Sequence, residues 1–262
     1  MKFPKKVTKH ICHWLEKYLK ESRTKGFVVG ISGGVDSAVT STLCAKTGYP
    51  VLCLEMPILQ EEGQVNRAQE HLNWLKSQYP NVHSLQVPLD AVYQSFTQVI
   101  PKSDNETAQF LSLANTRARF RMATLYYFAA LHGYLVAGTG NKVEDFGVGF
   151  YTKYGDGGVD ISPIADLLKT DVFALAKHLD IIPAIQHAAP TDGLWGDNRT
   201  DEDQLGATYP ELEWAMDAYE KGGTTPYSPR QKEVLELYTQ LHRQNLHKMI
   251  PIPVCKIPEE FK

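Results

Sequence analysis

The stretch Gly30-Ile31-Ser32-Gly33-Gly34-Val35-Asp36-Ser37 decides the fold of this chain, and it directly follows the apolar run Phe27-Val28-Val29. The order predicts a buried strand, a tight glycine turn and a helix that opens near Ser37. Such a turn gathers free backbone N–H groups and a helix N-terminus around one point, which suits a phosphate. Because the Asp36 carboxylate would repel a phosphate unless a divalent cation lay between them, the turn predicts ATP bound with Mg²⁺.

Two other phosphate-binding patterns are excluded. A Walker loop ends in Gly-Lys-Ser or Gly-Lys-Thr, and neither triplet occurs in the chain. A dinucleotide fingerprint requires G-x-G-x-x-G, and Gly138-Thr139-Gly140 begins this pattern but has Val143 at the third glycine position. The turn resembles instead the SGGxDS loop of the N-type ATP pyrophosphatases, which include NAD synthetase, GMP synthetase, asparagine synthetase and tRNA-thiolating enzymes. That resemblance implies cleavage of ATP between its α- and β-phosphates and leaves the second substrate open.

Composition indicates an ordinary globular chain that forms one domain over residues 1–262. The chain is 43% hydrophobic and 22% charged, with a formal net charge of −3, so no basic surplus favours nucleic-acid binding. The four cysteines are scattered and form no C-x-x-C pair, which favours reduced thiols. The first residues lack the apolar run of a signal peptide, and no segment has transmembrane length, so we expect a cytoplasmic protein without a membrane partner.

Short apolar runs alternate with helical patterns along the chain. The runs fall at 27–31, 51–54, 82–87 and 134–137, and the helical patterns between them at 37–46, 61–78 and 106–132. A further helix, with Trp14 and Tyr18 in its apolar stripe, precedes the first strand. This alternation predicts an α/β fold, a Rossmann-like doubly wound parallel sheet like that of the adenine nucleotide alpha hydrolases, with extra C-terminal helices near 169–179, 211–219 and 229–245.

In such a sheet, ligands bind beyond the carboxyl ends of the strands, near the switch in strand order. The glycine turn at 30–37 and the turn at 138–140 both follow strands, so they should face one crevice. The loop at 150–158, which contains Lys153, Asp156, two tyrosines and three glycines, could close over a bound nucleotide.

The segment Thr152-Lys153-Tyr154-Gly155-Asp156-Gly157-Gly158 resembles the signature loop of the NAD synthetases. Other segments resemble motifs of that family in the family's order: Asn115 to Met122 its N-x-[KR]-A-R-x-R-M helix, Gly138-Thr139 with Glu144 its G-T-x-x-x-x-E segment, and Ala189-Pro190-Thr191 its P-T turn. Asp203 to Gly206 with Tyr209, and the pair His247-Lys248, complete the series. The resemblance therefore spans almost the whole chain and implies the ammonia-dependent NAD synthetase reaction.

The resemblance also implies roles for single residues. Asp36 and Glu144 match the family's magnesium ligands. These two residues and Lys169 are the catalytic residues that the resemblance implies. Matches to positions that contact ATP are Gly30, Ile31, Ser32, Gly33, Gly34, Val35, Asp36, Ser37, Thr139, Lys169 and Thr191. Matches to positions that bind deamido-NAD are Arg121, Lys153, Asp160, His247 and Lys248.

The chain departs from the family pattern around residues 140–149. It has Gly140-Asn141-Lys142-Val143 where D-H-A-A is common, and one extra residue between Glu144 and the loop at 152–158. Val35 stands where many ammonia-dependent members carry Gln, but it contributes only backbone to the turn.

The implied reaction needs ATP, deamido-NAD and ammonia. The nicotinate carboxylate takes up AMP from ATP with release of pyrophosphate, and ammonia then displaces AMP to leave NAD. The resemblance further implies a homodimer and, since no cysteine has the surroundings of a nucleophile, no glutaminase domain. Two alternatives stay open at this point: another ligase of the superfamily, such as a GMP-synthetase-like enzyme, and a nucleotide-binding module without turnover.

Overall fold

A four-stranded parallel sheet of order β3-β2-β1-β4 forms the centre of the protein. The structure is a computed structural model, and it describes residues 1–60, 62–191, 200–222 and 226–262. The strands are β1 Phe27–Gly30, β2 Val51–Glu55, β3 Val82–Gln86 and β4 Leu135–Val136. Phe27 pairs with Val51 on one side and with Leu135 on the other. From β1 the chain adds β2 and β3 on one side, and it then adds β4 on the other side of β1. This switch in strand order at β1 confirms the predicted doubly wound α/β fold.

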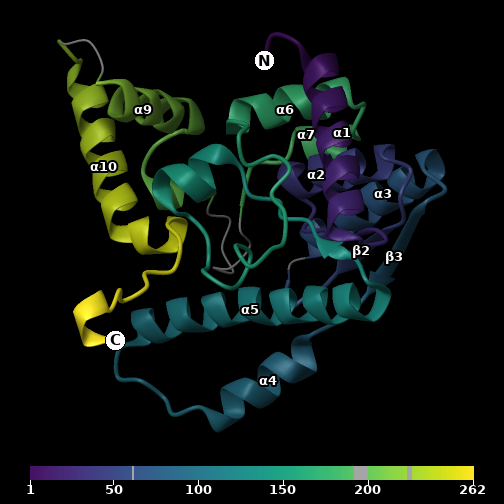
Figure 1. Cartoon of the computed structure of the whole chain (residues 1–262), viewed down its shortest axis with the longest axis horizontal. Helices are drawn as coiled ribbons and strands as arrows, with labels where there is room; N and C mark the ends of the chain where they lie inside the picture. Colours follow the sequence, from purple (N-terminus) through teal and green to yellow (C-terminus); the bar gives the residue numbers. More distant parts are fainter. Residues whose placement is uncertain (61, 192–199, 223–225) are drawn as a thin grey trace.

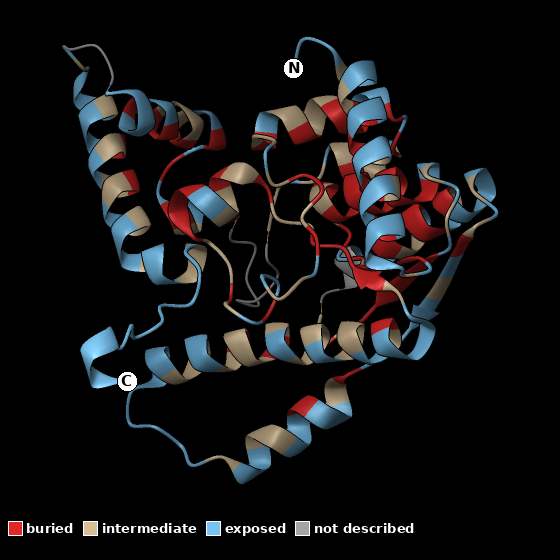
Figure 2. Ribbon diagram, viewed as in Figure 1, coloured by how far each residue is buried: buried red, intermediate tan, exposed pale blue. Residues whose placement is uncertain are grey.

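Helices cover both faces of the sheet (Figure 1). On one face, the largest hydrophobic cluster joins the sheet to α1 (Pro4–Ser22), α2 (Val35–Lys46), α3 (Glu62–Gln78), α6 (Lys169–His178) and α7 (Pro183–Gln186). On the other face, Val28, Leu54 and Val136 pack against α4 (Asp90–Val99) and α5 (Glu106–His132). Buried residues concentrate in the sheet and on the sides of the helices that face it (Figure 2). This leaves the carboxyl ends of the strands as the open edge.

A third hydrophobic cluster lies beyond that edge. It is built from α8 (Asp201–Leu205), α9 (Tyr209–Lys221), α10 (Pro229–Met249) and the π-helical turn η1 (Val143–Val148), and its largest fully buried side chains are Tyr238 and Leu212. The N-termini of α8, α9 and α10 are closed by capping boxes, in which a Thr or Ser side chain and the third helical residue exchange hydrogen bonds. The expected C-terminal helices are therefore present: α6 packs on the sheet, whereas α9 and α10 form a wall beside it. The chain ends in a single 3₁₀ turn, η2 (Glu259–Phe261).

Several details differ from the sequence-based expectation, among them the short helix α8, which was not predicted. The helix α4 was not predicted, although Leu89 and Tyr93 are buried against the sheet from its first turn. In α1, Trp14 and Tyr18 are exposed and contact each other with their rings tilted by 35°, so the stripe that enters the core consists of Thr8, Ile11, Leu15 and Leu19. Among the described residues, no helix combines the length and apolarity needed to cross a membrane.

His71 joins two helices inside the core. It lies on α3, is fully buried, and its Nε2 is 3.0 Å from the Ser41 hydroxyl on α2. Its Nδ1 has no hydrogen-bond partner among the described residues. Burial lowers the pKa of His71 to about 4, because the surrounding core does not solvate an imidazolium.

We predict that His71 makes the fold acid-sensitive. The unfolded chain binds a proton at this residue near pH 6.5 and the folded chain only near pH 4, so the free energy of unfolding falls as the pH drops through that window, by about 3 kcal/mol at most. Urea unfolding across the window should give a flatter pH dependence for His71→Gln than for the wild type. The exposed His13→Gln serves as the control and should keep the wild-type slope; equal slopes in all three proteins would contradict the assignment.

Candidate active site

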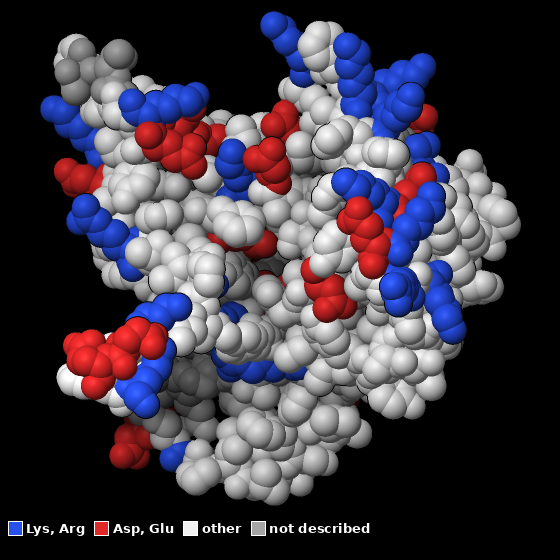
Figure 3. Space-filling view, viewed as in Figure 1, with Lys and Arg blue, Asp and Glu red and all other residues white. Residues whose placement is uncertain are grey.

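The carboxyl ends of the strands open into a pocket of about 510 Å³. It is lined by the glycine turn after β1, the segment after β2, α5, the turn after β4, the loop at 148–156 and the ends of α6 and α10. The space-filling view shows this face hollowed between the sheet half and the α9–α10 half, with acidic atoms visible inside (Figure 3). The pocket therefore lies where the sequence predicted the two glycine turns to meet.

The glycine turn is held in shape by its own serines. The Ser37 hydroxyl donates to the Gly34 carbonyl at 3.0 Å, and it accepts from the backbone N–H of Ser32 at 3.3 Å. The Ser32 hydroxyl accepts from the backbone N–H of Gly34 at 3.2 Å. Gly33 has a φ of +82°, which a side chain would strain, and α2 begins at Val35. All eight residues of the turn line the pocket, so the N-terminus of α2 faces it.

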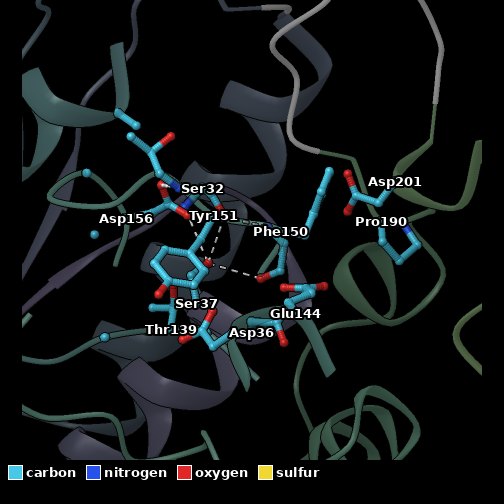
Figure 4. A pocket seen from close by; sticks show the side chains of 18 of the residues that line it. Ser32, Asp36, Ser37, Thr139, Glu144, Phe150, Tyr151, Asp156, Pro190 and Asp201 are labelled. Atoms are coloured by element: carbon cyan, nitrogen blue, oxygen red, sulfur yellow. Dashed lines mark hydrogen bonds between the residues drawn. The ribbon is translucent and has the colours of Figure 1, made fainter. Parts of the chain in front are cut away.

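Lys169 joins two carboxylates beside that turn. Its Nζ lies 2.6 Å from Asp36 Oδ2 and 2.9 Å from Glu144 Oε1, and the lysine side chain is only 4% exposed. The three residues come from α2, η1 and the first position of α6. Figure 4 shows Asp36 and Glu144 next to each other and turned into the pocket. This lysine–carboxylate centre brings together all three residues that the sequence assigned to catalysis.

One ammonium cannot neutralise two buried carboxylates, and their pKa values differ accordingly. Burial raises the pKa of Asp36 in spite of Lys169. Glu144 is also buried, but the Lys169 ammonium and the hydrogen bond from Tyr209 hold its pKa below the usual value. Desolvation would lower the pKa of Lys169, yet the two carboxylates together raise it. The centre therefore carries excess negative charge that a cation would relieve.

Sequence reasoning gave no role to two residues that orient this centre. Asn141 Nδ2 donates to Asp36 Oδ1 at 3.2 Å, while Asn141 Oδ1 accepts from the backbone N–H of Glu144 at 3.1 Å. The Tyr209 hydroxyl donates to Glu144 Oε1 at 2.6 Å, and its ring centroid lies 4.8 Å from Lys169 Nζ. The only signals in the sequence were indirect: Asn141 lies in the segment that departs from the family pattern, and Tyr209 lies in a matching one.

A π-helical turn lies where the sequence predicts one extra residue after Glu144. A π-turn accommodates one more residue than the α-helical turn it replaces, and η1 spans Val143–Val148. The turn directs two consecutive acids, Glu144 and Asp145, into the pocket lining. A Cβ at Gly140 would overlap the Asp145 carboxylate in its present position, so a side chain there would displace that carboxylate. Burial first, and Glu144 second, raise the pKa of Asp145.

The loop at 150–158 packs onto α5 and α10. Thr152 is buried; its hydroxyl donates to Asn115 Oδ1 at 2.6 Å, and its backbone N–H donates to Asp156 Oδ1 at 3.0 Å. On the α10 side, Lys153 Nζ donates to the His247 carbonyl at 2.6 Å. Lys248 Nζ donates to the carbonyls of Gly149 and Tyr151, both at 2.8 Å. The loop and the His247-Lys248 pair, which are about 95 residues apart in sequence, therefore form one structural unit.

The structure brings most, but not all, of the predicted site residues to the pocket. Those that line it are Gly30 to Ser37, Arg121, Thr139, Glu144, Lys169, Thr191 and Lys248. Lys153, His247 and Asp160 are not among the lining residues. Asp160 accepts hydrogen bonds from the Val136 N–H at 2.8 Å and the Tyr126 hydroxyl at 2.9 Å. Arg121 Nε donates to the Met56 carbonyl at 3.0 Å, and Arg121 Nη2 donates to Gln60 Oε1 at 2.9 Å.

The donor set at the lysine–carboxylate centre fits magnesium. Mg²⁺ takes oxygen ligands and in nucleotide enzymes is held by one or two carboxylates together with phosphate oxygens and water. Asp36 and Glu144 supply two carboxylates at the glycine turn, and the part of the chain that is described contains no group of three or more His, Cys, Asp or Glu residues that could hold a metal by itself. Such a centre suits a cation that arrives with a polyphosphate.

Comparison with known proteins points in one direction. A family model described as NAD synthase matches residues 7–251. The NH(3)-dependent NAD(+) synthetase of Mycoplasma genitalium is 39% identical over 246 residues, which cover 92% of this chain and 93% of that protein. The enzyme of the same name from Carboxydothermus hydrogenoformans is 35% identical over 247 residues, with 92% and 93% covered. Among solved structures, NMN synthetase from Francisella tularensis superposes with a TM-score of 0.82 at 32% identity, covering 98% of both chains.

Proposed function

Since the chain belongs to the NAD synthase family, it is a ligase that amidates deamido-NAD with ammonia and ATP to give NAD, and we propose that this reaction takes place in the pocket at the carboxyl edge of the sheet. The observation that carries the proposal is the lysine–carboxylate centre beside the glycine turn. It combines a phosphate-binding helix N-terminus with two carboxylates suited to a magnesium nucleotide. A GMP-synthetase-like enzyme or a silent binding module is not favoured by these relatives.

The glycine turn receives the phosphates of ATP. Its residues, Ser32 and Ser37 included, line the pocket, and Thr139 and Thr191 line the same cavity from the β4 side and the segment after α7. The nicotinate carboxylate attacks the α-phosphorus, the bond to the bridging oxygen breaks, and pyrophosphate leaves. Ammonia then attacks the activated carbonyl carbon, and AMP leaves with the electron pair. The protein aligns these groups and lowers the repulsion between two anions.

Asp36 and Glu144 would hold Mg²⁺, which when bound neutralises phosphate charge. Asn141 and Tyr209 fix the orientation of these carboxylates before the nucleotide arrives, because each already donates a hydrogen bond to one of them. Lys169 keeps the two carboxylates together in the free enzyme. Because Asp36 belongs to the glycine turn, the Lys169 ammonium could also bond to a phosphate oxygen held there. We propose no covalent nucleophile on the protein.

Deamido-NAD is proposed to bind where the loop at 150–158 meets α10. Lys153, His247 and Lys248 come together there, and Arg121 faces the pocket from α5. Asp160, which we also propose for deamido-NAD, accepts from the β4 backbone and does not line the pocket. Lys153 and Lys248 now bond to backbone carbonyls, so the dinucleotide would have to replace those contacts with its own phosphate or carboxylate oxygens.

We propose that residues 1–262 form one domain and that this domain contains no glutaminase site. Ammonia would then enter the pocket directly. No cysteine lines the pocket among the described residues. Burial raises the pKa of Cys12 to about 11 and that of Cys53 to about 12, so neither is a thiolate at neutral pH. Four free cysteines also fit the reducing cytoplasm, the location that we propose.

We further propose a homodimer. Tyr127 and Leu131 on α5 are 63% and 61% exposed, and a second copy packed on this helix would cover them. Light scattering should give twice the chain mass, and Leu131→Glu should shift the protein toward the monomer. A monomeric wild type would overturn this proposal without affecting the catalytic assignment.

The Francisella protein provides one observation in favour of a second acceptor. It is an NMN synthetase, and it resembles this chain over 98% of both lengths. Nicotinate mononucleotide carries the same carboxylate on the same ring, so the two-step chemistry applies without change. Its amidation to nicotinamide mononucleotide is therefore the second candidate function.

One assay separates the possibilities. Protein, ATP, Mg²⁺ and ammonium are incubated with deamido-NAD or with nicotinate mononucleotide, and the amide product, AMP and pyrophosphate are followed. We expect NAD, AMP and pyrophosphate in equal amounts from the first acceptor, and a higher kcat/KM than with the mononucleotide. The reverse preference would assign the second function, whereas no amide from either acceptor, or ADP in place of AMP, would refute both.

We predict that Asp36→Asn lowers kcat at least ~100-fold, because the loss of a magnesium ligand removes several kcal/mol of stabilisation from the phosphoryl-transfer step. Asn keeps the size of the side chain and can still bond to Lys169, so the fold should survive. The matched control is Asp166→Asn, since Asp166 is exposed and forms only a surface ion pair with Lys142. A rate in Asp36→Asn close to that of the control would be incompatible with the metal assignment.

A further inference from the structure

Four cations line the pocket in the described part of the chain, and three of them are already engaged. Lys169 bonds to Asp36 and Glu144, Arg121 to the segment after β2, and Lys248 to two backbone carbonyls. The fourth, Arg67 on α3, makes no hydrogen bond or ion pair with any described residue, and its Nε is buried without a partner. A guanidinium left unpaired in the wall of a pocket for anions indicates a ligand that is itself anionic.

The packing of two helices places Arg67 level with the glycine turn. Helices α2 and α3 run parallel on the same face of the sheet, because each follows one of two neighbouring parallel strands. His71 on α3 contacts Ser41 on α2 at 3.0 Å. Arg67 lies four residues before His71 on α3, and Ser37 lies four residues before Ser41 on α2. Each is therefore about one helical turn, or 5.4 Å, nearer to the pocket than this contact. Arg67 therefore stands beside the first turn of α2, where the phosphates are proposed to bind.

The arginine side chain also extends toward that end of α3. Its Nη1 lies 3.9 Å from the point that a Cβ on Gly63 would occupy, one turn nearer the helix N-terminus. Glu55, the acid at the end of β2, does not neutralise it. The Glu55 carboxylate accepts from Gln69 Nε2 and forms no ion pair with Arg67 in the described structure.

The two sides of the glycine turn differ in chemistry. The lysine–carboxylate centre lies on the β4 side, where Glu144 and Lys169 reach the turn. An apolar wall lies on the α5 face: the point that a Cβ on Gly30 would occupy is 3.4 Å from Met56 Cε and 3.7 Å from Leu125 Cδ1. That wall suits the adenine ring. Arg67 lies on the opposite, α2–α3 face, so it is positioned for phosphate and not for the base.

We infer that Arg67 binds the outer phosphate groups of ATP and the pyrophosphate that leaves. A planar guanidinium can bond to two phosphate oxygens at once, and it supplies positive charge on the side of the turn away from the lysine–carboxylate centre. Arg67 is then a positioning residue for the leaving group. This inference rests on the proposed function, because it takes ATP cleavage at the α-phosphate as given.

The test measures binding directly and needs no turnover. Magnesium pyrophosphate and AMP are each titrated into the protein by calorimetry for the wild type, Arg67→Gln and Arg67→Lys. The control is Lys76→Gln, which removes a positive charge from the exposed last turn of the same helix. We expect the pyrophosphate Kd of Arg67→Gln to rise at least about tenfold, or 1.4 kcal/mol, with the AMP Kd unchanged. Arg67→Lys should fall between it and the wild type, and the control should match the wild type.

Three results would overturn the inference: an unchanged pyrophosphate Kd in Arg67→Gln, an equal loss of AMP and pyrophosphate binding, or a wild type that binds no pyrophosphate. Urea unfolding of Arg67→Gln shows whether a loss reflects damage to the fold. NAD formation by the wild type is read separately, so failure of this inference and failure of the proposed function give different outcomes.

Discussion

The contact of the Lys169 ammonium with two carboxylates holds three separate segments of the chain together at the pocket. Asp36 belongs to the first turn of α2, Glu144 to the π-turn after β4, and Lys169 to the start of α6. Each segment alone would leave a charged group in a largely buried place, which is unfavourable by several kcal/mol. Their meeting makes the three segments mutually dependent. It also leaves one negative charge uncompensated, so that the free site is already matched to a cation.

The sheet explains why these segments meet. Strand order β3-β2-β1-β4 puts β1 in the middle, with the chain leaving toward β2 and returning at β4. The crevice opens between the connections that leave β1 and β4, and the glycine turn that follows β1 lines it. The third hydrophobic cluster then closes the β4 side, because Tyr209 extends from α9 to Glu144. A polar contact thus joins the added C-terminal wall to the sheet half of the molecule.

Much of this was predictable from the sequence, for reasons that are local. Each buried strand is a short apolar run, and α5 begins and ends at the predicted residues because Asn105 caps it and Gly133 adopts a left-handed conformation with φ of +67°. The helix α4 was overlooked although Leu89, Val92, Tyr93 and Phe96 have helical spacing. At the site, motif matching found the three residues of the centre, but Lys169 and Asp36 are 133 positions apart. No local pattern could show that their atoms touch, or that Asn141 and Tyr209 would bond to the same carboxylates.

The distribution of charge around the glycine turn bears on which bond of ATP is broken. Walker-type enzymes place a lysine within the turn, next to the terminal phosphates, and transfer the outer phosphoryl group. Here the turn has no lysine, Glu144 and Lys169 reach the Asp36 carboxylate from its β4 side, and the unpaired guanidinium of Arg67 stands on its α3 side. Positive charge on the outer phosphates favours their departure as a unit, while a metal on the other side favours attack at the α-phosphorus. The turn and its two flanks therefore fit the release of pyrophosphate better than the transfer of a single phosphate.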